Sequence, residues 1–358
     1  MSEVTADRLA SYLSGRLGEG DVEVRNLTEH VEGWSRDTVS FTAAYETEDD
    51  AREERLVVRA QSDEQAEGGA GDQRAARGND IETEFRTMEA AHEGGVRVPE
   101  PRWYEPDPSH LGGEFFLVEH LPGESPVVWD PRDRKDLYAA WDSEVRRLPN
   151  QFVDAAATIH DLGHEDVPEL DDCAPGDVVE RELDRWVGAY REAAFWTEPA
   201  IEEVIRWLRT RQPTVPETTL VHGDFRIGNM LVDDGELTGV LDWELARIGD
   251  PMYDLGYAST YYFSGKLVDP IERPNLVSSL VDREWFYEEY ERRTGRTVDR
   301  ERVRYWRVFA AFVMMTIAIA GADRYRRDET NDVRDAWFQY IVPGLVEDQL
   351  AIVRDDRL

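Results

Sequence analysis

Hydrophobic and polar residues alternate in short runs through the first third of the chain, and this pattern predicts a β-rich region. One amphipathic helix precedes the strands and another interrupts them, because apolar residues recur there at helical spacing. The second helix carries Ile81, Phe85 and Met88 on one face. The predicted elements are, in chain order, a helix at 5–17, strands at 22–27, 38–45 and 56–60, a helix at 81–93 and a strand at 114–120.

From about residue 150 onward, the apolar spacing becomes helical. The predicted helices are 152–162, 178–190, 201–210, 285–293, 303–323 and 335–345. The longest apolar run, 308–322, is shorter than the roughly 20 residues that a membrane-spanning helix needs, so we expect a buried core helix. The order of elements predicts an α+β protein with a small β-rich lobe and a large, mainly helical lobe.

A β-hairpin is predicted within the helical region. Two short apolar runs, Met230–Val232 and Leu237–Leu241, flank an Asp-Gly turn, which is a strong hairpin pattern. Folding at this turn brings Asn229 and Asp242 together at the open end of the hairpin. Asp224 lies on the loop that enters the hairpin. We therefore expect three oxygen-bearing side chains to converge at one end of a small β element.

These three side chains suit magnesium-dependent phosphoryl transfer. Mg²⁺ prefers oxygen ligands and usually shares its coordination shell with the phosphates of a substrate. Asp242 and the amide oxygen of Asn229 can supply the protein ligands, and Asp224 is left to accept a proton from an attacking hydroxyl. The plain alternative is that the aspartates are turn formers and solvated caps, which would explain any one of them taken alone.

The sequence of this segment resembles that of the aminoglycoside phosphotransferase-like, or small-molecule kinase, family. His222-Gly223-Asp224-Phe225-Arg226-Ile227-Gly228-Asn229 follows the catalytic-loop template of kinases. Asp242-Trp243-Glu244 stands where protein kinases have Asp-Phe-Gly, and Asp250-Pro251 follows it. Within the family, the motifs of this segment look most like those of the kinase domains joined to acyl-CoA dehydrogenases. The resemblance implies a two-lobed protein-kinase-like fold, with a small antiparallel β-sheet lobe over 1–120 and a mainly helical lobe over 121–358.

The resemblance also implies roles for the residues around the predicted base, Asp224. Arg226 stands where kinases often place a cation that touches the transferred phosphoryl group; a solvated surface arginine is the alternative. His222 is expected to brace the loop by hydrogen bonds, because Asp224 already holds the base position. Asp254 is expected to tie down the backbone of the catalytic loop.

In the N-terminal lobe, the resemblance points to three residues that would serve the nucleotide. Ser35 lies in the turn Gly33–Asp37 and matches a phosphate-loop position of the family, although an ordinary hairpin turn explains it as well. Arg59 occupies the strand position where kinases have a phosphate-binding lysine, and its planar fork can also bind phosphate. Glu84 lies beside the apolar face of the next helix and is the expected partner of Arg59. An exposed arginine and a solvated glutamate are the alternatives.

The strand at 114–120 runs into the hinge that the resemblance predicts between the two lobes. In the family, backbone groups at this point meet adenine, and here they would be those of Glu119 and Leu121. The strand ends at Leu121-Pro122-Gly123, so a plain buried strand followed by a turn is the alternative.

Composition says less about the function of the protein than the motifs do. The chain of 358 residues has a formal net charge of −35, and its lysines are only Lys135 and Lys266. Acidic excess with scarce lysine, spread along the whole chain, favours a protein that stays soluble at molar salt over one with an acidic partner-binding surface. Charge therefore says little about the substrate. A single cysteine, Cys173, excludes an internal disulfide.

The expected function is ATP-dependent phosphorylation of a hydroxyl on a small molecule, with Mg²⁺. The acceptor would be a hydroxyacyl-CoA or hydroxy acid, an aminoglycoside, a choline-like alcohol or a sugar. A catalytically silent, kinase-like nucleotide-binding scaffold is the alternative. The polar start of the chain predicts a cytoplasmic location, and no nucleic-acid or membrane partner is expected. The choice between ATP and GTP, and the oligomeric state, stay open.

Overall fold

The computed structural model describes residues 4–17, 21–30, 36–46, 50–61, 78–196, 198–265 and 272–354. The first part of the chain forms α1 (Ala6–Leu17), β1 (Glu23–His30), β2 (Asp37–Glu46), β3 (Ala51–Ala60), α4 (Ile81–Glu93), β4 (Pro101–Glu105) and β5 (Phe115–Glu119). The middle part forms α5 (Pro131–Asp142), α6 (Arg147–His160), α7 (Val178–Ala193), α8 (Pro199–Thr210), β6 (Thr219–Val221), the 3₁₀ turn η1 (Ile227–Asn229), β7 (Met230–Asp233), β8 (Glu236–Val240), η2 (Trp243–Leu245) and β9 (Arg247–Gly249). The last part forms α9 (Met252–Ala258), η3 (Tyr261–Ser264), β10 (Leu276–Val277), β11 (Val281–Asp282), α10 (Arg283–Thr294), α11 (Arg300–Arg326), α12 (Val333–Phe338) and α13 (Val342–Arg354).

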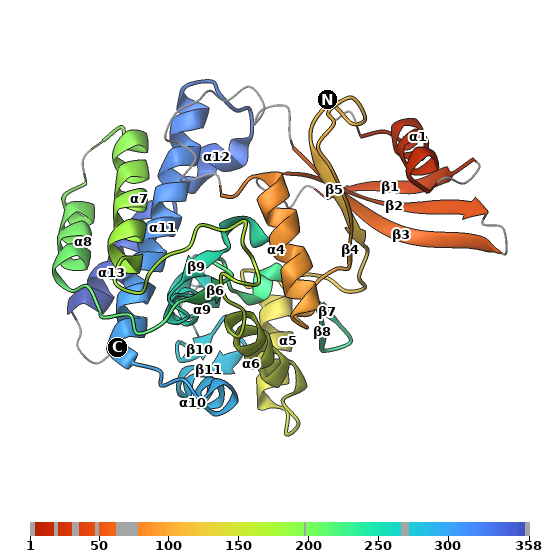
Figure 1. Ribbon diagram of the computed structural model, residues 1–358. Helices are drawn as coiled ribbons and strands as arrows, with labels where there is room; N and C mark the ends of the chain where they lie inside the picture. The colour runs from red at the N-terminus through yellow and green to blue at the C-terminus, as the bar shows by residue number, and fades with distance from the viewer. Residues whose placement is uncertain are drawn as a thin grey trace.

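The N-terminal strands form one antiparallel sheet of five strands in the order β1-β2-β3-β5-β4. Figure 1 shows this sheet on one side of the molecule, with α1 against it and the mainly helical part on the other side. In the register, Arg59 of β3 stands opposite Phe116 of β5. The predicted α+β architecture, a small antiparallel sheet followed by a mainly helical region, is confirmed.

Strand β3 is longer than its apolar run. The prediction began at Leu56, whereas the strand begins at Ala51. The added half carries charged residues that are mostly exposed, and it continues to pair with β2 as far as Glu46. Backbone pairing with β2 holds this half in the sheet, so hydrophobic alternation could not reveal it.

Helix α4 lies between the sheet and the helical part (Figure 1). Asp80 caps its N-terminus by accepting a hydrogen bond from the Thr83 N–H. The buried face includes Phe85 and Met88, as predicted, and also the carboxylate of Glu84, which is fully buried. A fully buried carboxylate needs cationic partners, so α4 points a charge inward toward the centre of the molecule.

Two hydrophobic clusters fill the described part of the molecule. The smaller one joins α1 to β2, β3 and β5. The larger one runs through the helical region and also takes in α4 and the side chains of Phe116 and Val118 from β5. Strand β5 therefore contributes to both clusters. The predicted lobe boundary at residues 120 and 121 stays a prediction.

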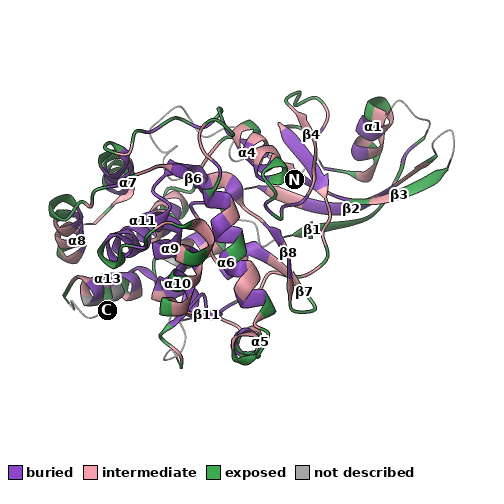
Figure 2. Ribbon diagram, turned by 60° about the horizontal axis from the view of Figure 1, so that its bottom comes forward, coloured by how far each residue is buried: buried purple, intermediate pink, exposed green. Residues whose placement is uncertain are grey.

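Helix α11 is the central helix of the C-terminal region. It has 27 residues, from Arg300 to Arg326, and packs against α7, α9, α12 and α13. By length and composition alone it could cross a membrane, but 83% of its most apolar window is buried inside the protein. Figure 2 shows α11 and α9 mostly in the colour of buried residues. The helix is longer than its apolar run predicted, and its burial agrees with the expected core helix.

One prediction about helices was wrong, and a helix was missed. The expected helix over residues 335–345 is in fact two helices, α12 and α13, and Pro343 lies in the first turn of the second. Proline in a helix interior would clash with the preceding turn and remove a hydrogen bond, whereas the first turn tolerates it. Helix α5 was not predicted, although Asp130 followed by Pro131 is a recognisable N-cap and first position.

The predicted hairpin is present as β7 and β8. Asp234 and Gly235 form its turn with positive φ angles of 47° and 75°, which is the backbone that an Asp-Gly pair favours. Met230 pairs with Val240, so the residues just outside the strands meet at the open end. A second short pair, β6 with β9, lies on either side of the hairpin in the sequence and frames the predicted catalytic loop.

Candidate active site

The candidate catalytic loop begins where β6 ends. Gly223 has a φ angle of +84°, and a Cβ atom there would lie 2.1 Å from the carbonyl oxygen of Leu245. Only glycine fits this turn without displacing the backbone of η2. The turn directs the chain so that Asp224 follows at the edge of the helical region, with its side chain partly accessible.

Asp254 in α9 holds the backbone of this loop through hydrogen bonds. Its carboxylate accepts hydrogen bonds from the backbone N–H of His222 at 2.7 Å and of Gly223 at 2.9 Å. The same carboxylate lies 3.1 Å from Nε2 of His160 in α6. Burial disfavours its charge, but the hydrogen bond and charge of His160, with His222, outweigh burial and hold the pKa of Asp254 below its usual value. Asp254 is therefore placed to fix the loop backbone, as the sequence predicted.

The ring of His222 is fully engaged in local hydrogen bonds. Its Nε2 lies 2.9 Å from the carbonyl oxygen of Leu241, and its Nδ1 lies 3.2 Å from the backbone N of Asp224. Because a carbonyl can only accept and a backbone N–H can only donate, Nε2 carries the proton and Nδ1 accepts. Neither nitrogen is left to take a proton from a substrate. This geometry supports the structural role predicted for His222.

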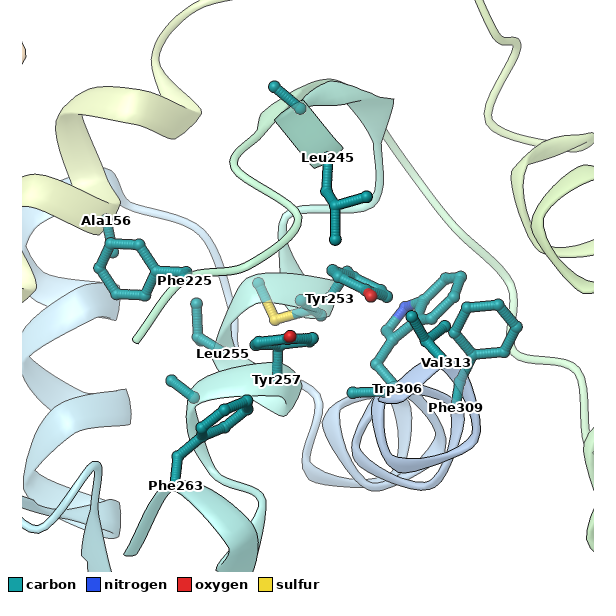
Figure 3. Close-up of a cluster of buried hydrophobic side chains, with 14 of the residues drawn as sticks. Ala156, Phe225, Leu245, Tyr253, Leu255, Tyr257, Phe263, Trp306, Phe309 and Val313 are labelled. Carbon is teal, nitrogen blue, oxygen red and sulfur yellow. The ribbon is translucent and has the colours of Figure 1, made fainter. Parts of the chain in front are cut away.

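Asp224 has two neighbours that hold its carboxylate. The Nε atom of Arg226 lies 3.0 Å from its Oδ1 atom. The phenol of Tyr257 in α9 also forms a hydrogen bond with it. Burial and the charge of Asp224 raise the pKa of Tyr257 well above its ordinary value, so the phenol keeps its proton and donates to the carboxylate. Figure 3 shows Tyr257 on α9 close to Phe263, within the buried cluster.

Arg226 is not a solvated surface side chain. Its guanidinium carbon lies 5.4 Å from the centre of the Phe263 ring. A Cβ atom at Gly228 would lie 2.2 Å from its Nη1 atom, so the glycine leaves room for the arginine to fold back over the loop. Burial opposes its charge, but Asp224 more than offsets burial, and the pKa of Arg226 rises. The arginine is thus held beside the predicted base.

Asn229 and Asp242 lie together at the open end of the hairpin. The backbone N–H of Leu241 donates to the carbonyl of Asn229 at 2.8 Å, which places the two side chains on adjacent segments. The Nδ2 atom of Asn229 donates to the carbonyl of Asp224 at 2.9 Å, so its amide oxygen is free to face elsewhere. Asp242 has a left-handed backbone, with φ of 68°, a strained state typical of functional sites.

The donor set at this end fits a magnesium ion that shares its ligands with a nucleotide. One carboxylate and one amide oxygen are the hard oxygen donors that Mg²⁺ prefers. Among the residues that the structure describes, no three His, Cys, Asp or Glu side chains group into a site that would hold a metal by themselves. Two protein ligands leave several positions open, which phosphate oxygens and water would fill.

The basic strand residue and the acidic helix residue meet as the sequence predicted. Nη1 of Arg59 lies 2.6 Å from Oε1 of Glu84, and Nη2 lies 3.3 Å from Oδ1 of Asp242. Burial opposes the charge of Arg59, but Glu84 and Asp242 more than offset it and raise its pKa. Arg36 adds a second cation, with Nε 3.2 Å from Oε2 of Glu84. The predicted contact is confirmed, and the nucleotide-binding role stays a prediction.

Asn79, just before α4, links this ion-pair cluster to the hairpin. Its backbone N–H donates to the carbonyl of Glu244 at 2.6 Å, and its Nδ2 atom donates to the carbonyl of Ala246 at 2.8 Å. Its own carbonyl accepts from Nη2 of Arg36 at 2.8 Å. The start of α4 is therefore tied to the segment that follows the candidate metal ligand Asp242.

The remaining predicted nucleotide-site residues are Glu119, Leu121 and Ser35. The backbone N–H of Glu119 donates to the carbonyl of Glu100 at 3.0 Å. A contact between Glu119 and adenine would therefore be made by the carbonyl oxygen of Glu119. The side chain of Leu121 packs on β8, because a Cβ atom at Gly239 would lie 2.7 Å from its Cδ1 atom. Ser35 lies outside the described residues.

Three residues of the site were missed by the sequence analysis: Tyr257, His160 and Arg36. Tyr257 could have been found, because it follows Asp254 by three positions and therefore shares its helical face. His160 contacts Asp254 across 94 positions of sequence and also lies 2.7 Å from the Tyr290 hydroxyl. No local pattern marks that contact, and none marks the contact of Arg36 with Glu84.

Comparison with known proteins gives one matching family model. The model of the phosphotransferase enzyme family matches residues 27–306. Among curated proteins, mouse acyl-CoA dehydrogenase family member 10 is 31% identical over 268 residues, covering 73% of this chain and 22% of that protein. Human acyl-CoA dehydrogenase family member 11 is 28% identical over 285 residues, covering 76% of this chain and 35% of that protein. The chain thus spans about a fifth to a third of the length of these relatives.

Solved structures show the same fold at low identity. A Ralstonia eutropha protein classed with the aminoglycoside phosphotransferases has a TM-score of 0.69 and 20% identity, and the match covers 98% of both chains. A thermostable mutant of aminoglycoside phosphotransferase APH(4)-Ia, in a ternary complex with AMP-PNP and hygromycin B, has a TM-score of 0.55 and 18% identity, with 95% of this chain and 98% of that chain covered. These matches confirm the kinase-like fold.

Proposed function

The chain belongs to the phosphotransferase enzyme family, and from this premise we propose that it transfers the γ-phosphate of ATP to a hydroxyl group of a small molecule. The observation that carries the proposal is the meeting of four chain segments at one place. Arg59 and Glu84 reach it from β3 and α4, Asp224 from the catalytic loop, and Asp242 from the end of the hairpin. Such a set serves phosphoryl transfer better than any structural purpose alone.

In the proposed reaction, the acceptor oxygen forms a bond to the γ-phosphorus while the bond to the leaving oxygen of ADP breaks. Asp224 would orient the acceptor hydroxyl and take its proton. Arg226 lies beside Asp224 and would contact the transferred group, since its guanidinium is held 3.0 Å from that carboxylate. Arg59 would hold the inner phosphates, in a position fixed by Glu84. These groups act mainly by positioning reactants and neutralising charge.

Asn229 and Asp242 are the residues that would hold magnesium. When bound, the ion would neutralise charge on the β- and γ-phosphates. AMP-PNP is bound in the structure of APH(4)-Ia, and ADP is bound in that of spectinomycin phosphotransferase APH(9)-Ia. These complexes support a nucleotide as the phosphate donor for this chain.

For the acceptor, we favour a hydroxyacyl-CoA or a related hydroxy acid. The support is the likeness in sequence to the acyl-CoA dehydrogenase family members 10 and 11 over most of this chain. Aminoglycosides, choline-like alcohols and sugars are the other acceptor classes that the family resemblance suggests. A 57-residue stretch that is 39% identical to hygromycin-B 4-O-kinase of Escherichia coli covers only 16% of this chain, so it adds little weight to an aminoglycoside.

The test uses ATP labelled in the γ-phosphate and a small-molecule metabolite extract, in molar KCl with Mg²⁺. Wild type is compared with Asp224→Asn, which removes the base and keeps the shape of the side chain. Asp233→Asn is the matched control, because Asp233 lies exposed at the turn end of the hairpin. We expect a labelled product from wild type and the control, and none from Asp224→Asn. Binding of Mg-ATP is measured on all three proteins.

Three outcomes would contradict the proposal. Full activity in Asp224→Asn would remove Asp224 from the base position. No product together with no Mg-ATP binding would overturn the kinase assignment. If wild type binds Mg-ATP and labels nothing in extracts that contain all four acceptor classes, the protein is the nucleotide-binding scaffold that was the alternative.

A further inference from the structure

Two arginines of the helical region lie near one aromatic ring without an acidic partner. Arg307 of α11 is 3% exposed, and its guanidinium carbon lies 4.3 Å from the centre of the Tyr261 ring. The guanidinium carbon of Arg283, at the start of α10, lies 6.0 Å from the same ring centre. In the part of the chain that the structure describes, neither arginine has a carboxylate within ion-pair distance.

Other buried arginines of this protein do have such partners. Arg247 lies 2.9 Å from Glu182, and Arg302 lies 3.3 Å from Asp250. The chain carries 76 acidic residues, so a shortage of carboxylates does not explain the difference. A buried cation without a counter-charge is unfavourable, because water no longer solvates it. The absence of an acid beside Arg283 and Arg307 therefore calls for a source of negative charge.

The guanidinium N–H groups that lack a hydrogen-bond partner have a defined geometry. The Nε and Nη2 atoms of Arg307 are buried and have no hydrogen-bond partner, and the same holds for Nε of Arg283. Nε and Nη2 form one edge of the guanidinium, and this edge can donate two parallel hydrogen bonds to the two oxygens of a carboxylate or phosphate. Arg307 therefore presents an unfilled bidentate edge.

The electrostatics around the pair agree with this geometry. Burial lowers the pKa of Arg307, and the charge of Arg283 lowers it further. Burial alone would raise the pKa of the Tyr261 phenol, but the charges of Arg307 and Arg283, and the hydrogen bonds of both arginines to the phenol, bring it below its ordinary value. The lowered pKa of Tyr261 therefore reports positive charge around its phenol, inside a protein whose net charge is −35.

We propose that Arg283 and Arg307 bind a small oxyanion, a carboxylate or a phosphate-like group, where η3, α10 and α11 meet. Each unpartnered N–H would then find an acceptor, and the anion would balance the buried charge of Arg307 and the partly buried charge of Arg283, whose Nη2 atom already donates to the carbonyl of Pro274 at 3.2 Å. The site adjoins the candidate active site along the chain, because Tyr262, next to Tyr261, lies close enough to Arg226 and Asp224 for their charges to affect its pKa.

The first experiment measures thermal unfolding with potassium sulfate as the probe, at constant molar ionic strength set with KCl. Wild type is compared with Arg307→Met, which removes the charge, and with Arg304→Met as the control. Arg304 is also buried on α11, but its Nη2 donates to the carbonyl of Ile352 at 2.7 Å. General effects of sulfate on folding act on all three proteins, so the difference between them isolates the site.

We expect sulfate to raise the melting temperature of wild type and Arg304→Met by about 2 °C more than that of Arg307→Met, at roughly ten times the dissociation constant. The extra rise should saturate. In chloride alone, Arg307→Met should melt no lower than wild type, because it removes an uncompensated buried charge. An equal response in all three proteins, or a large loss of stability in Arg307→Met that sulfate does not affect, would overturn the proposal.

A second arm separates the two sources of such an oxyanion and depends on the proposed function. Sulfate is added to the labelled-ATP assay. If the oxyanion is part of the acceptor, sulfate lowers product formation, and more extract restores it. If the site holds a free inorganic anion, product formation is unchanged while the melting shift persists. The melting experiment needs no catalytic activity, so it tests the site even if the kinase assignment fails.

Discussion

The guanidinium of Arg59 lies 2.6 Å from the fully buried carboxylate of Glu84. The other Nη atom of Arg59 lies 3.3 Å from Asp242. One planar fork therefore joins the sheet, helix α4 and the end of the catalytic hairpin. A lysine has a single ammonium group and a flexible stem, so it would not hold both carboxylates in one fixed geometry. The arginine is thus a specific choice at this position.

Arg59→Lys tests this bridge. The variant keeps the positive charge, but it loses one charge-assisted hydrogen bond, which contributes about 1.5 kcal/mol. We expect Mg-ATP to bind about tenfold more weakly, while the protein stays folded. Equilibrium binding of a fluorescent ATP analogue measures the change. Arg55→Lys, on the same strand but exposed, is the control and should bind as wild type does; equal affinity in all three proteins would remove Arg59 from the nucleotide site.

Much of this site could be predicted because its contacts follow from spacing and register. The Asp-Gly turn fixes the hairpin, and the hairpin fixes the nearness of Asn229 to Asp242. The contact of Arg59 with Glu84 was implied by the resemblance to kinases, and the place of Glu84 beside the apolar face of its helix only selected the residue. Local rules were therefore sufficient for the hairpin, whereas the contact of Arg59 with Glu84 needed the family resemblance.

The unpredicted contacts join elements whose approach is set by packing. His160, at the end of α6, reaches Asp254 of α9 across 94 positions of sequence, so tertiary packing sets this contact. Arg36 reaches Glu84 only because the sheet packs on α4. Arg283 and Arg307, which lack a carboxylate partner among the described residues, come from two different helices. A pattern read along one chain segment contains no information about such approaches.

Tyr257→Phe tests the support of the predicted base. The ring keeps its place beside Tyr253 and Phe263 in the buried cluster (Figure 3), but the carboxylate of Asp224 loses a hydrogen-bond donor. A hydrogen bond to a charged group contributes about 1.5 to 3 kcal/mol, so we expect the turnover rate to fall about tenfold or more. Binding of Mg-ATP should not change, because the phenol interacts with Asp224 and not with the candidate metal ligands.

The labelled-ATP assay with a fixed amount of extract measures this rate. Tyr253→Phe is the matched control, since Tyr253 is equally buried in α9 and its hydroxyl contacts Arg247 instead. If Tyr257→Phe and Tyr253→Phe lose the same fraction of activity, the effect comes from packing in the helix. The hydrogen bond to Asp224 would then have no separate role.

Asp242→Asn tests the metal site. Asparagine tolerates the left-handed backbone at this position, where φ is 68°, so the variant should fold. It lacks the negative charge that a hard divalent cation prefers. We expect ATP to bind more weakly and the Mg²⁺ dependence of binding to be lost. Asp234→Asn also replaces an aspartate with positive φ in the same hairpin, and it should keep the Mg²⁺ dependence; retention of that dependence in Asp242→Asn would refute the assignment.

Acid should weaken the anchor that Asp254 forms. The pKa of this carboxyl is lower in the folded protein than its ordinary value, because the hydrogen bond and charge of His160, with His222, outweigh the effect of burial. A depressed pKa contributes stability at pH values above the unfolded value of about 4, and this contribution is lost as pH falls through the folded value. In Asp254→Asn that part of the acid dependence should disappear.

Asp254→Asn should also lower the stability of the folded protein at neutral pH. An amide has one oxygen, whereas the carboxylate accepts from two backbone N–H groups, of His222 and Gly223, through different oxygens. One buried donor would be left unsatisfied, at about 2 kcal/mol. Urea unfolding between pH 7 and pH 3 should therefore show a less stable variant at pH 7 and a smaller difference from wild type in acid. A difference that stays constant over this range would show that folding does not shift the pKa of Asp254, contrary to the depressed pKa.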